Sequence, residues 1–326
     1  MLGISAIGVY VFAFVGRRFA QRPSFPPADL LKKANMKNRK FIGTLCAIGA
    51  AVCYGTNPFG ALNLYALGFA TNSVLFYRFS LALVLITILQ LCRRESFKVS
   101  AREFGTLTAL GLLFSASSLS LYVAFTRMDA GVASTLLFVY PIMTALLMAL
   151  LFHERVTART ATAIVLSMAG VALLYWTGNG QTLDSLGVAL VMVSALTYAV
   201  YIIVMNRSRL SMSSFKINFF VTAYCLLGIL VYSLVLGTPI QAVASPRAWF
   251  YVAWLAVVPT IFALVLLVRA AKWVGSTPTA VMGALEPLTA VLIGILVFGE
   301  AFTPRLAVGI VLILTAVIVI ALKKER

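Results

Sequence analysis

The sequence predicts an all-α membrane protein whose ten transmembrane helices form two inverted five-helix repeats around a central cavity. Hydrophobic residues make up 62% of the chain and charged residues only 11%, whereas a soluble domain carries about 25% charged residues. The apolar residues are gathered into continuous stretches of about 20, the length that a helix needs to cross a bilayer. An internal repeat, described below, provides the division into two halves.

Ten apolar segments are expected to cross the membrane, and short connections leave no room for an inserted soluble domain. Asn57-Pro58, Pro141 and Pro287 interrupt three of them, where proline weakens the helix. The segments are residues 41–63, 72–92, 104–125, 130–152, 158–177, 185–205, 214–236, 249–270, 276–299 and 303–322.

Lysine and arginine predict the orientation. With the N-terminus in the cytoplasm, only Arg127, Arg247 and Arg305 of the 26 basic residues fall outside, and Arg78 lies within a span. This bias predicts a cell-membrane protein with both termini cytoplasmic. The net charge of +17 therefore reflects topology, and its spread over many short loops does not indicate a nucleic-acid partner.

The N-terminal 40 residues differ from the rest of the chain. Residues 1–40 form a basic extension that we expect on the cytoplasmic side, and Met36 opens a short basic start to the first span. We expect residues 1–35 to lie outside the working fold, so that a chain beginning at Met36 still inserts and functions. The two repeats then occupy residues 41–177 and 185–322.

Residues typical of enzymes and metal sites are scarce. Cys46, Cys53, Cys92 and Cys225 all fall in predicted spans, so no disulfide framework is expected. The single histidine, His153, cannot build a metal site by itself. Nucleotide loops, nucleophile elbows and zinc-protease motifs are absent from the sequence. We therefore expect neither an enzyme nor a cofactor.

Residues 140–159 repeat in residues 286–305 at one constant offset. Four polar or conformationally special positions match: Pro141 with Pro287, Glu154 with Glu300, Thr157 with Thr303 and Arg159 with Arg305. Because each unit has five helices, the second enters the membrane upside down relative to the first. Inverted repeats are the architecture of many secondary transporters, in which they provide inward-open and outward-open arrangements.

The sequence resembles a known family at these segments. LYVAFTRMDAGVASTLLFVYPIMTALLMALLFHERVTARTATAIVLSMAGVALL (residues 121–174) is similar to the EamA domain of the drug/metabolite transporter superfamily. A second copy, from about Val268 to Ile320, contains the typical segment GALEPLTAVLIGILVFGE. The resemblance implies ten helices, an inverted repeat, a central cavity and movement of small metabolites, often amino-acid export.

Two charged residues within the spans are the first candidates for a substrate site. A carboxylate near the middle of a bilayer is costly, so Glu286 either lines a wet substrate path, as an amine ligand or proton carrier, or is a structural residue at the Pro287 kink. Arg78 either extends its guanidinium towards the membrane interface or has a functional role. In the second case it is a counter-ion for Glu286 or a ligand for a substrate carboxylate. Together they could meet the two ends of a zwitterion.

Uncharged polar and aromatic residues complete the candidate set. Tyr140 is the repeat mate of Glu286, and Asn57-Pro58 breaks the first span and exposes backbone. Each tyrosine either lines the cavity or belongs to ordinary packing or the aromatic belt. The further tyrosines are Tyr54, Tyr77, Tyr122, Tyr198 and Tyr201. Pro58, Pro141 and Pro287 are candidate hinges, and Glu154 and Glu300 are expected to close structural hairpins at the membrane edge.

The sequence therefore predicts a secondary transporter that exports small metabolites, amino acids or related amphipathic solutes, by alternating access. Its expected partners are a small-molecule substrate and the lipid bilayer, with proton coupling left open. A sugar-phosphate or nucleotide-sugar exchanger is the nearest alternative, although phosphate would call for several basic residues in the cavity. A non-transporting membrane scaffold is another, and it would need neither a cavity nor a charge within a span.

Overall fold

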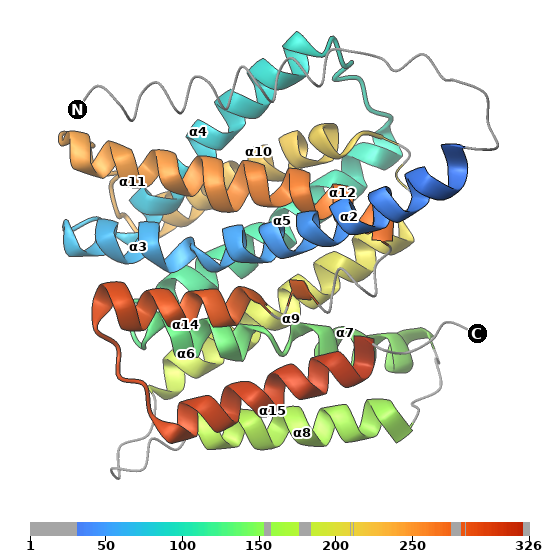
Figure 1. Cartoon of the computed structure of the whole chain (residues 1–326). Helices are drawn as coiled ribbons and strands as arrows, with labels where there is room; N and C mark the ends of the chain where they lie inside the picture. Colours follow the sequence, from blue (N-terminus) through green and yellow to red (C-terminus); the bar gives the residue numbers. More distant parts are fainter. Residues whose placement is uncertain are drawn as a thin grey trace. The chain divides into compact units, whose positions relative to one another are not determined.

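The computed structural model describes residues 31–321, apart from residues 153–157, 176–183, 209, 211, 275–281 and 284, and within that part all regular structure is helical (Figure 1). The elements are α2 (Leu31–Gly55), α3 (Asn57–Ala66), α4 (Thr71–Cys92), α5 (Ala101–Ala124), α6 (Ala130–Leu137), α7 (Tyr140–Phe152), α8 (Ala158–Tyr175), α9 (Ser185–Arg207), α10 (Ser214–Val235), α11 (Pro246–Ala256), η1 (Val257–Phe262), α12 (Ala263–Val274), α14 (Leu285–Phe298) and α15 (Pro304–Ala321).

The chain divides into two compact units, residues 1–41 and residues 42–326. The described part of the first unit is the start of α2, from Leu31 to Phe41, and it carries several of the basic residues of the extension. The second unit holds all the other described helices, and it is the unit in which the candidate site lies.

Seven described helical segments are long and apolar enough to cross a membrane. They are Phe41–Ala66, Thr71–Cys92, Ala101–Ala124, Ala130–Leu151, Ser185–Met205, Phe215–Val235 and Pro246–Leu267, and shorter apolar helices occur at Ala161–Gly170, Leu285–Phe298 and Pro304–Ala316. Large apolar side chains such as Leu150, Leu234 and Leu296 are 72%, 80% and 79% exposed. Apolar exposure on this scale is expected where lipid surrounds a protein.

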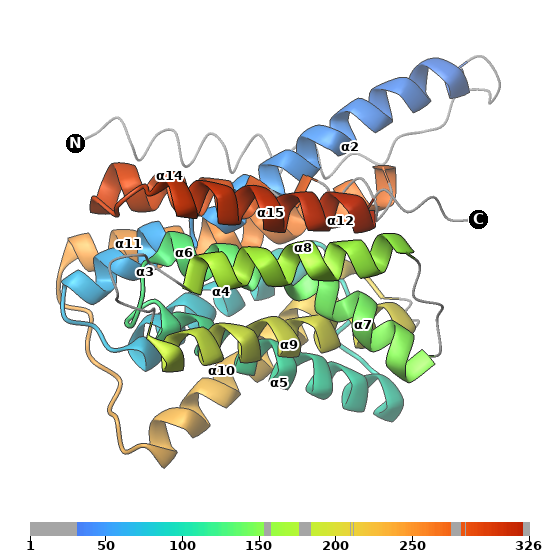
Figure 2. The same cartoon turned by 90° about the horizontal axis from the view of Figure 1, so that it is seen from below.

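Helices of the two sequence halves lie side by side. In both views α8 lies along α15, and close contacts also join α4 with α10, α5 with α9, and α6 with α14 (Figures 1 and 2). At Gly170 of α8 an added Cβ would lie 2.7 Å from Ile313 Cγ1 and 3.1 Å from the Gly309 carbonyl oxygen. Glycine therefore lets these backbones approach closely, as is common where helices pack in membranes.

Three of the long apolar segments are not regular α-helices. The first is broken at Thr56, between α2 and α3, and Pro58 lies in the first turn of α3. The fourth is broken at Phe138 and Val139, between α6 and α7. The segment from Pro246 to Leu267 contains the π-helix η1, with Pro259 inside it. Proline lacks the N–H that an α-helix needs, and π-helical turns often occur at functional sites.

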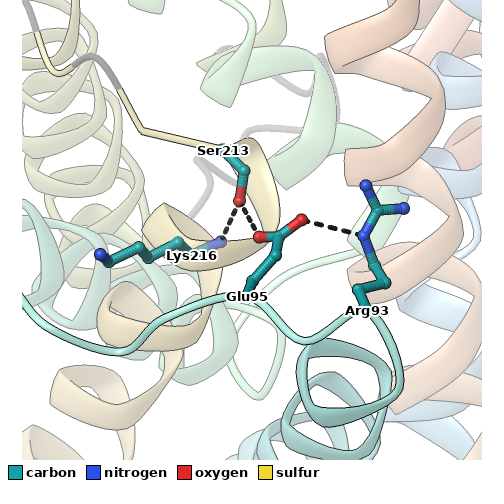
Figure 3. A network of polar contacts seen from close by, with 4 residues as sticks. All are labelled: Arg93, Glu95, Ser213 and Lys216. Atoms are coloured by element: carbon teal, nitrogen blue, oxygen red, sulfur yellow. Dashed lines mark hydrogen bonds and ion pairs between the residues drawn. The ribbon is translucent and has the colours of Figure 1, made fainter.

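The antiparallel pair of α4 and α10 is tied by polar contacts at both ends. At one end (Figure 3) Glu95 accepts hydrogen bonds from Arg93 Nε, at 2.9 Å, and from the Ser213 hydroxyl. The same hydroxyl accepts from the backbone N–H of Lys216 at 3.2 Å, so that Ser213 caps α10 while it holds the loop after α4.

At the other end of this pair the roles are exchanged, because the start of α4 binds the chain after α10. Asn72 Nδ2 donates to Ser233 Oγ and to the Thr238 carbonyl oxygen, both at 3.0 Å. The Gln241 N–H donates to Ser73 Oγ at 2.9 Å. The two ends together keep α4 and α10 in register.

We predict that Glu95→Gln removes a stabilisation that is present at neutral pH and fades in acid. Burial would raise the pKa of Glu95, but the Ser213 and Arg93 hydrogen bonds and the charges of Arg93 and Lys216 outweigh it, so its pKa lies below the ordinary glutamate range. The stabilisation is therefore lost as the pH falls through that lowered pKa. Because Arg93 is 40% exposed, we expect about 1 kcal/mol or less.

Thermal unfolding of the detergent-solubilised protein at pH 7 and near pH 3 measures this effect. The difference in unfolding temperature between wild type and Glu95→Gln should be smaller near pH 3 than at pH 7. The control is Arg102→Gln, which removes an exposed arginine; its difference in unfolding temperature from wild type should be the same at both pH values. An equal gap at both pH values for Glu95→Gln would contradict the assignment.

Candidate functional site

Arg78 of α4 is a buried cation held by uncharged groups. Its side chain is 4% exposed, Nε donates to Thr260 Oγ1 at 3.0 Å, and Nη1 donates to the Tyr122 hydroxyl at 2.5 Å. Its Cζ atom lies 5.2 Å and 5.4 Å from the ring centroids of Phe79 and Tyr122, which adds cation–π attraction. Among the described residues it forms no ion pair within 4.0 Å.

A chain of hydrogen bonds leads from Arg78 to the break between α2 and α3. The Tyr122 hydroxyl donates to Asn57 Oδ1 at 3.1 Å, and Asn57 Nδ2 donates to the Tyr54 carbonyl oxygen at 2.8 Å. The Thr56 hydroxyl donates to the Cys53 carbonyl oxygen at 2.7 Å. Side chains therefore satisfy backbone carbonyls at the end of α2, which an apolar environment would otherwise leave costly.

Thr260 is a site residue that the sequence analysis missed. It lies in η1, where its hydroxyl accepts from Arg78 Nε and donates to the Leu255 carbonyl oxygen at 2.9 Å. The π-helical turn and Pro259 disturb the regular bonding of this helix, so the hydroxyl supplies a bond that the backbone does not. A proline followed by threonine within the apolar stretch VVPTIF was the signal that could have identified it.

Glu286 lies beside the same break, on α14. An added Cβ at Gly55 would lie 2.6 Å from the Glu286 carbonyl oxygen and 2.5 Å from Thr289 Cβ, so the end of α2 touches the first turn of α14. The Glu286 residue is half-buried, and no described cation lies within 4.0 Å of its carboxylate. Arg78 and Glu286 are therefore not an ion pair, although the chain brings both to the α2/α3 break.

Three of the predicted tyrosines form one group, which we name the tyrosine cluster: Tyr140, Tyr198 and Tyr201. The rings of Tyr140 and Tyr198 meet edge to face at 4.7 Å between centroids, and those of Tyr198 and Tyr201 are stacked at 5.7 Å. Tyr54 is near enough to Glu286 and Arg78 for both charges to act on it, and Tyr140 is near Glu286 and Tyr54. The cluster thus adjoins Glu286 through Tyr140, and Tyr54 lies between Glu286 and Arg78.

Tyr77 lies apart from the other predicted residues. Its ring packs against Phe76 at 5.2 Å and Trp249 at 5.7 Å, and Trp249 is itself 46% exposed. Arg78 follows Tyr77 directly in the sequence, but the helix directs the two side chains to different neighbours. The structure therefore does not bring Tyr77 to the group around Arg78.

The three candidate hinge prolines all occupy first turns of described helices. Pro58 is in the first turn of α3, Pro141 is the second residue of α7, and Pro287 is the third residue of α14 and is buried. A proline in a first turn costs little, because the N–H groups of that turn have no partner within the helix. Hinge motion at these positions stays a prediction.

Glu300 joins the second half of the chain to the first. Its Oε1 accepts from the Ala130 N–H at 2.8 Å and its Oε2 from the Gly131 N–H at 3.1 Å, which caps α6. An added Cβ at Gly294 would lie 2.0 Å from Oε2, so glycine makes room for the carboxylate. Burial raises the pKa of Glu300 and nearby Asp129 adds to this, against the two backbone hydrogen bonds, so the pKa lies above its usual range.

The helix-capping contact of Glu300 is consistent with the structural role expected from the sequence. Its repeat mate Glu154, with His153, lies outside the described residues. Among the described residues no group of three or more His, Cys, Asp or Glu side chains could hold a metal ion.

A family profile described as "EamA-like transporter family" matches residues 41–176 and again residues 185–322. An "Uncharacterized transporter" of Archaeoglobus fulgidus is 27% identical over 277 residues, covering 85% of this chain and 95% of that protein. The "Uncharacterized inner membrane transporter YicL" of Salmonella typhimurium is 26% identical over 210 residues, covering 64% and 69%.

A solved crystal structure has a similar fold. It superimposes with a TM-score of 0.60 at 18% sequence identity, covering 85% of this chain and 96% of its own. At this identity the likeness concerns the fold alone. The profile matches, in contrast, include both copies of the proline- and glutamate-containing segment, with Pro141 in the first match and Pro287 and Glu300 in the second.

We predict that Glu300→Ala destabilises the protein by about 1–2 kcal/mol, because it leaves two N–H groups of α6 without their acceptor. Thermal unfolding in detergent measures the loss. The matched control is Glu103→Ala, at a glutamate of the α5 capping box whose hydrogen bonds with Ser100 are exposed. Water can replace that carboxylate, so the control should cost less, and an equal cost for both variants would contradict the assigned role.

Proposed function

The chain belongs to the EamA-like transporter family, and on that premise we propose that it is a secondary transporter which exports amino acids or related amphipathic solutes by alternating access. The observation that carries the proposal is the placement of Arg78 and Glu286. They have opposite charges, come from different halves of the chain and flank the α2/α3 break without neutralising each other. A dipolar solute would complement both.

We propose ten spans in two inverted repeats, residues 41–177 and 185–322. Helix contacts support this, because they occur in pairs that a pseudo-twofold axis would exchange. Equivalent helices meet in α4 with α10, α6 with α14, and α8 with α15. The contact of α5 with α9 has its mate in α3 with α11, that of α5 with α10 in α4 with α11, and that of α7 with α9 in α3 with α14.

The proposed orientation has both termini in the cytoplasm of a cell, with the chain in its cell membrane. The distribution of lysine and arginine supports it. In this orientation the contacts of Glu95 with Arg93 and Ser213 lie on the cytoplasmic side, and those of Asn72 with Thr238 lie on the outer side. The bonds of Glu95 with Ser213 and of Asn72 with Thr238 each join one half of the chain to the other.

The proposed substrate path runs along Arg78, Tyr122, Asn57, Tyr54 and Glu286. The tyrosine cluster provides ring faces and hydroxyls beside it. Tyr54, Asn57 and Glu286 are only half-buried, although all lie at the contact between α2, α3 and α14. Such partial exposure supports a water-accessible space there, as expected for discontinuous helices at a transporter binding site.

The charges favour amino acids over phosphate-bearing solutes. Among the described residues Arg78 is the one charged side chain that is buried. A phosphate group carries up to two negative charges and is usually met by several cations, whereas a zwitterion needs one charge of each sign. A non-transporting scaffold would gain nothing from two unpaired charges at a helix break, because each is costly in an apolar interior.

We predict that purified protein in proteoliposomes moves at least one solute from a panel of amino acids, nucleosides and sugar phosphates, with amino acids favoured. Glu286 is the proposed proton-carrying group, so an imposed pH gradient should change the rate for wild type. Glu286→Gln cannot carry a proton and should lose this response, with transport reduced about tenfold or more.

Glu103→Gln serves as the control, because it changes a carboxylate in the first turn of α5, at the opposite end of that helix from Tyr122. It should keep the wild-type rate and pH response. Proton coupling through Glu286 is wrong if Glu286→Gln responds to the gradient as wild type does. The transporter proposal itself is wrong if no solute of a broad panel moves in either direction.

A further inference from the structure

Arg78 has no ionic partner among the described residues, although it is nearly completely buried. A buried charge normally requires a counter-ion, because desolvation strongly disfavours an isolated ion. Here two uncharged hydroxyls and two ring faces take that place. Those partners hold the side chain but leave its positive charge uncompensated.

The guanidinium keeps N–H groups for another acceptor. Its bonds to Thr260 and Tyr122 use one N–H of Nε and one of Nη1, which is fewer than the group can donate. A planar guanidinium matches a carboxylate, which accepts two parallel hydrogen bonds and carries one negative charge. One carboxylate would therefore satisfy both the free donors and the charge.

We infer that Arg78 binds the carboxylate of the transported solute, and that Thr260 is the positioning residue which sets the guanidinium for it. This inference rests on the proposed transport function and names the group on the solute that the protein recognises. It separates the roles of the two charged residues, because the carboxylate end meets Arg78 while Glu286 faces the amine end.

The geometry of η1 supports the positioning role. The Thr260 hydroxyl donates its one hydrogen bond to the Leu255 carbonyl oxygen. The hydroxyl oxygen can therefore only accept a hydrogen bond from another group, and Arg78 Nε is the donor. This fixed polarity holds one edge of the guanidinium. The Tyr122 hydroxyl similarly donates to Asn57 and accepts from Nη1. Both partners thus fix the orientation of the guanidinium and leave its other N–H groups for one further acceptor.

The bond between Tyr122 and Asn57 also links the carboxylate site to the α2/α3 break. Asn57 caps the end of α2 through the Tyr54 carbonyl oxygen. A carboxylate bound to the free N–H groups of Arg78 would offset the positive charge that acts on the Tyr122 hydroxyl, and so change the bonds that stabilise the break. Binding would therefore act on the segment that includes the candidate hinge Pro58.

The test measures binding to the full chain in detergent with probes that differ only in the carboxylate. Phenylalanine and leucine are compared with their amides, phenylalaninamide and leucinamide, by the shift in unfolding temperature as probe concentration rises. We expect saturable shifts with at least one amino acid and affinities lower by about tenfold or more for the amides, because a buried charge is left unpaired. This comparison uses wild type and needs no variant to fold.

Variants locate the site. Arg78→Gln should abolish the difference between acid and amide. Thr260→Val, which has a similar shape but lacks the hydroxyl, should weaken binding of the amino acid about tenfold, and Thr260→Ser should restore it. Arg127→Gln is the control, because Arg127 is 44% exposed and paired with Asp184 at 3.1 Å; it should bind as wild type does.

The inference is overturned if the amides bind as tightly as the acids, if neither amino acid binds, or if Arg78→Gln keeps the preference for the acid. Flux of the same probes in proteoliposomes separates this failure from that of the proposed function. If acids and amides are transported at equal rates, the transport function stands but Arg78 is not a carboxylate site. Carboxylate-selective binding without flux of any solute would instead contradict transport and leave the binding assignment intact.

Discussion

The break between α2 and α3 is the constraint on which the rest of the described site depends. In a bilayer, backbone groups released from a helix must find other partners, because no water is available around the helix to bind them. At this break the Asn57 amide and the Thr56 hydroxyl bind the carbonyls of Tyr54 and Cys53. Gly55 meanwhile allows α14 to touch the end of α2. The side chains that replace the lost helical hydrogen bonds are therefore also the ones that connect the break to Arg78. The close contact at Gly55 places Glu286 beside the same break.

The polar residues around the break come from separate parts of the chain and support one another. Arg78 belongs to α4, Tyr122 to α5 and Thr260 to η1, while Glu286 belongs to α14. A change in the relative position of any of these helices would alter the hydrogen bonds of the others. The ties at both ends of α4 and α10, in contrast, keep that pair in register. In the proposed transport cycle this pair is the fixed part, and the segments around the breaks move against it.

Composition was enough to predict an all-helical membrane protein, and polar residues within apolar runs pointed to several of the residues that lie around the α2/α3 break. A membrane-spanning helix needs only a sufficiently long run of apolar residues, so the apolar runs predict where helices lie. Arg78, Asn57 and Glu286 are conspicuous in the sequence because polar groups within such runs are costly. The proline before Thr260 distinguishes this threonine in the sequence, but its bond to Arg78 depends on a π-helical turn that the sequence does not predict. The grouping of Tyr140, Tyr198 and Tyr201, and the separation of Tyr77, depend on helix rotation, which an almost uniformly apolar sequence does not specify.

The central claim is that a water-accessible space beside Glu286 opens to each side of the membrane in turn. Labelling of Thr289→Cys with a membrane-impermeant thiol reagent tests it most directly, in a chain with Cys46, Cys53, Cys92 and Cys225 replaced by serine or alanine. Thr289 contacts the end of α2, and Leu296→Cys, at a leucine that is 79% exposed on the same helix, serves as the lipid-facing control. The account predicts labelling of Thr289→Cys in both right-side-out and inside-out vesicles and little labelling of Leu296→Cys. Labelling of Thr289→Cys from one side alone, or no more labelling than in the control, would contradict it.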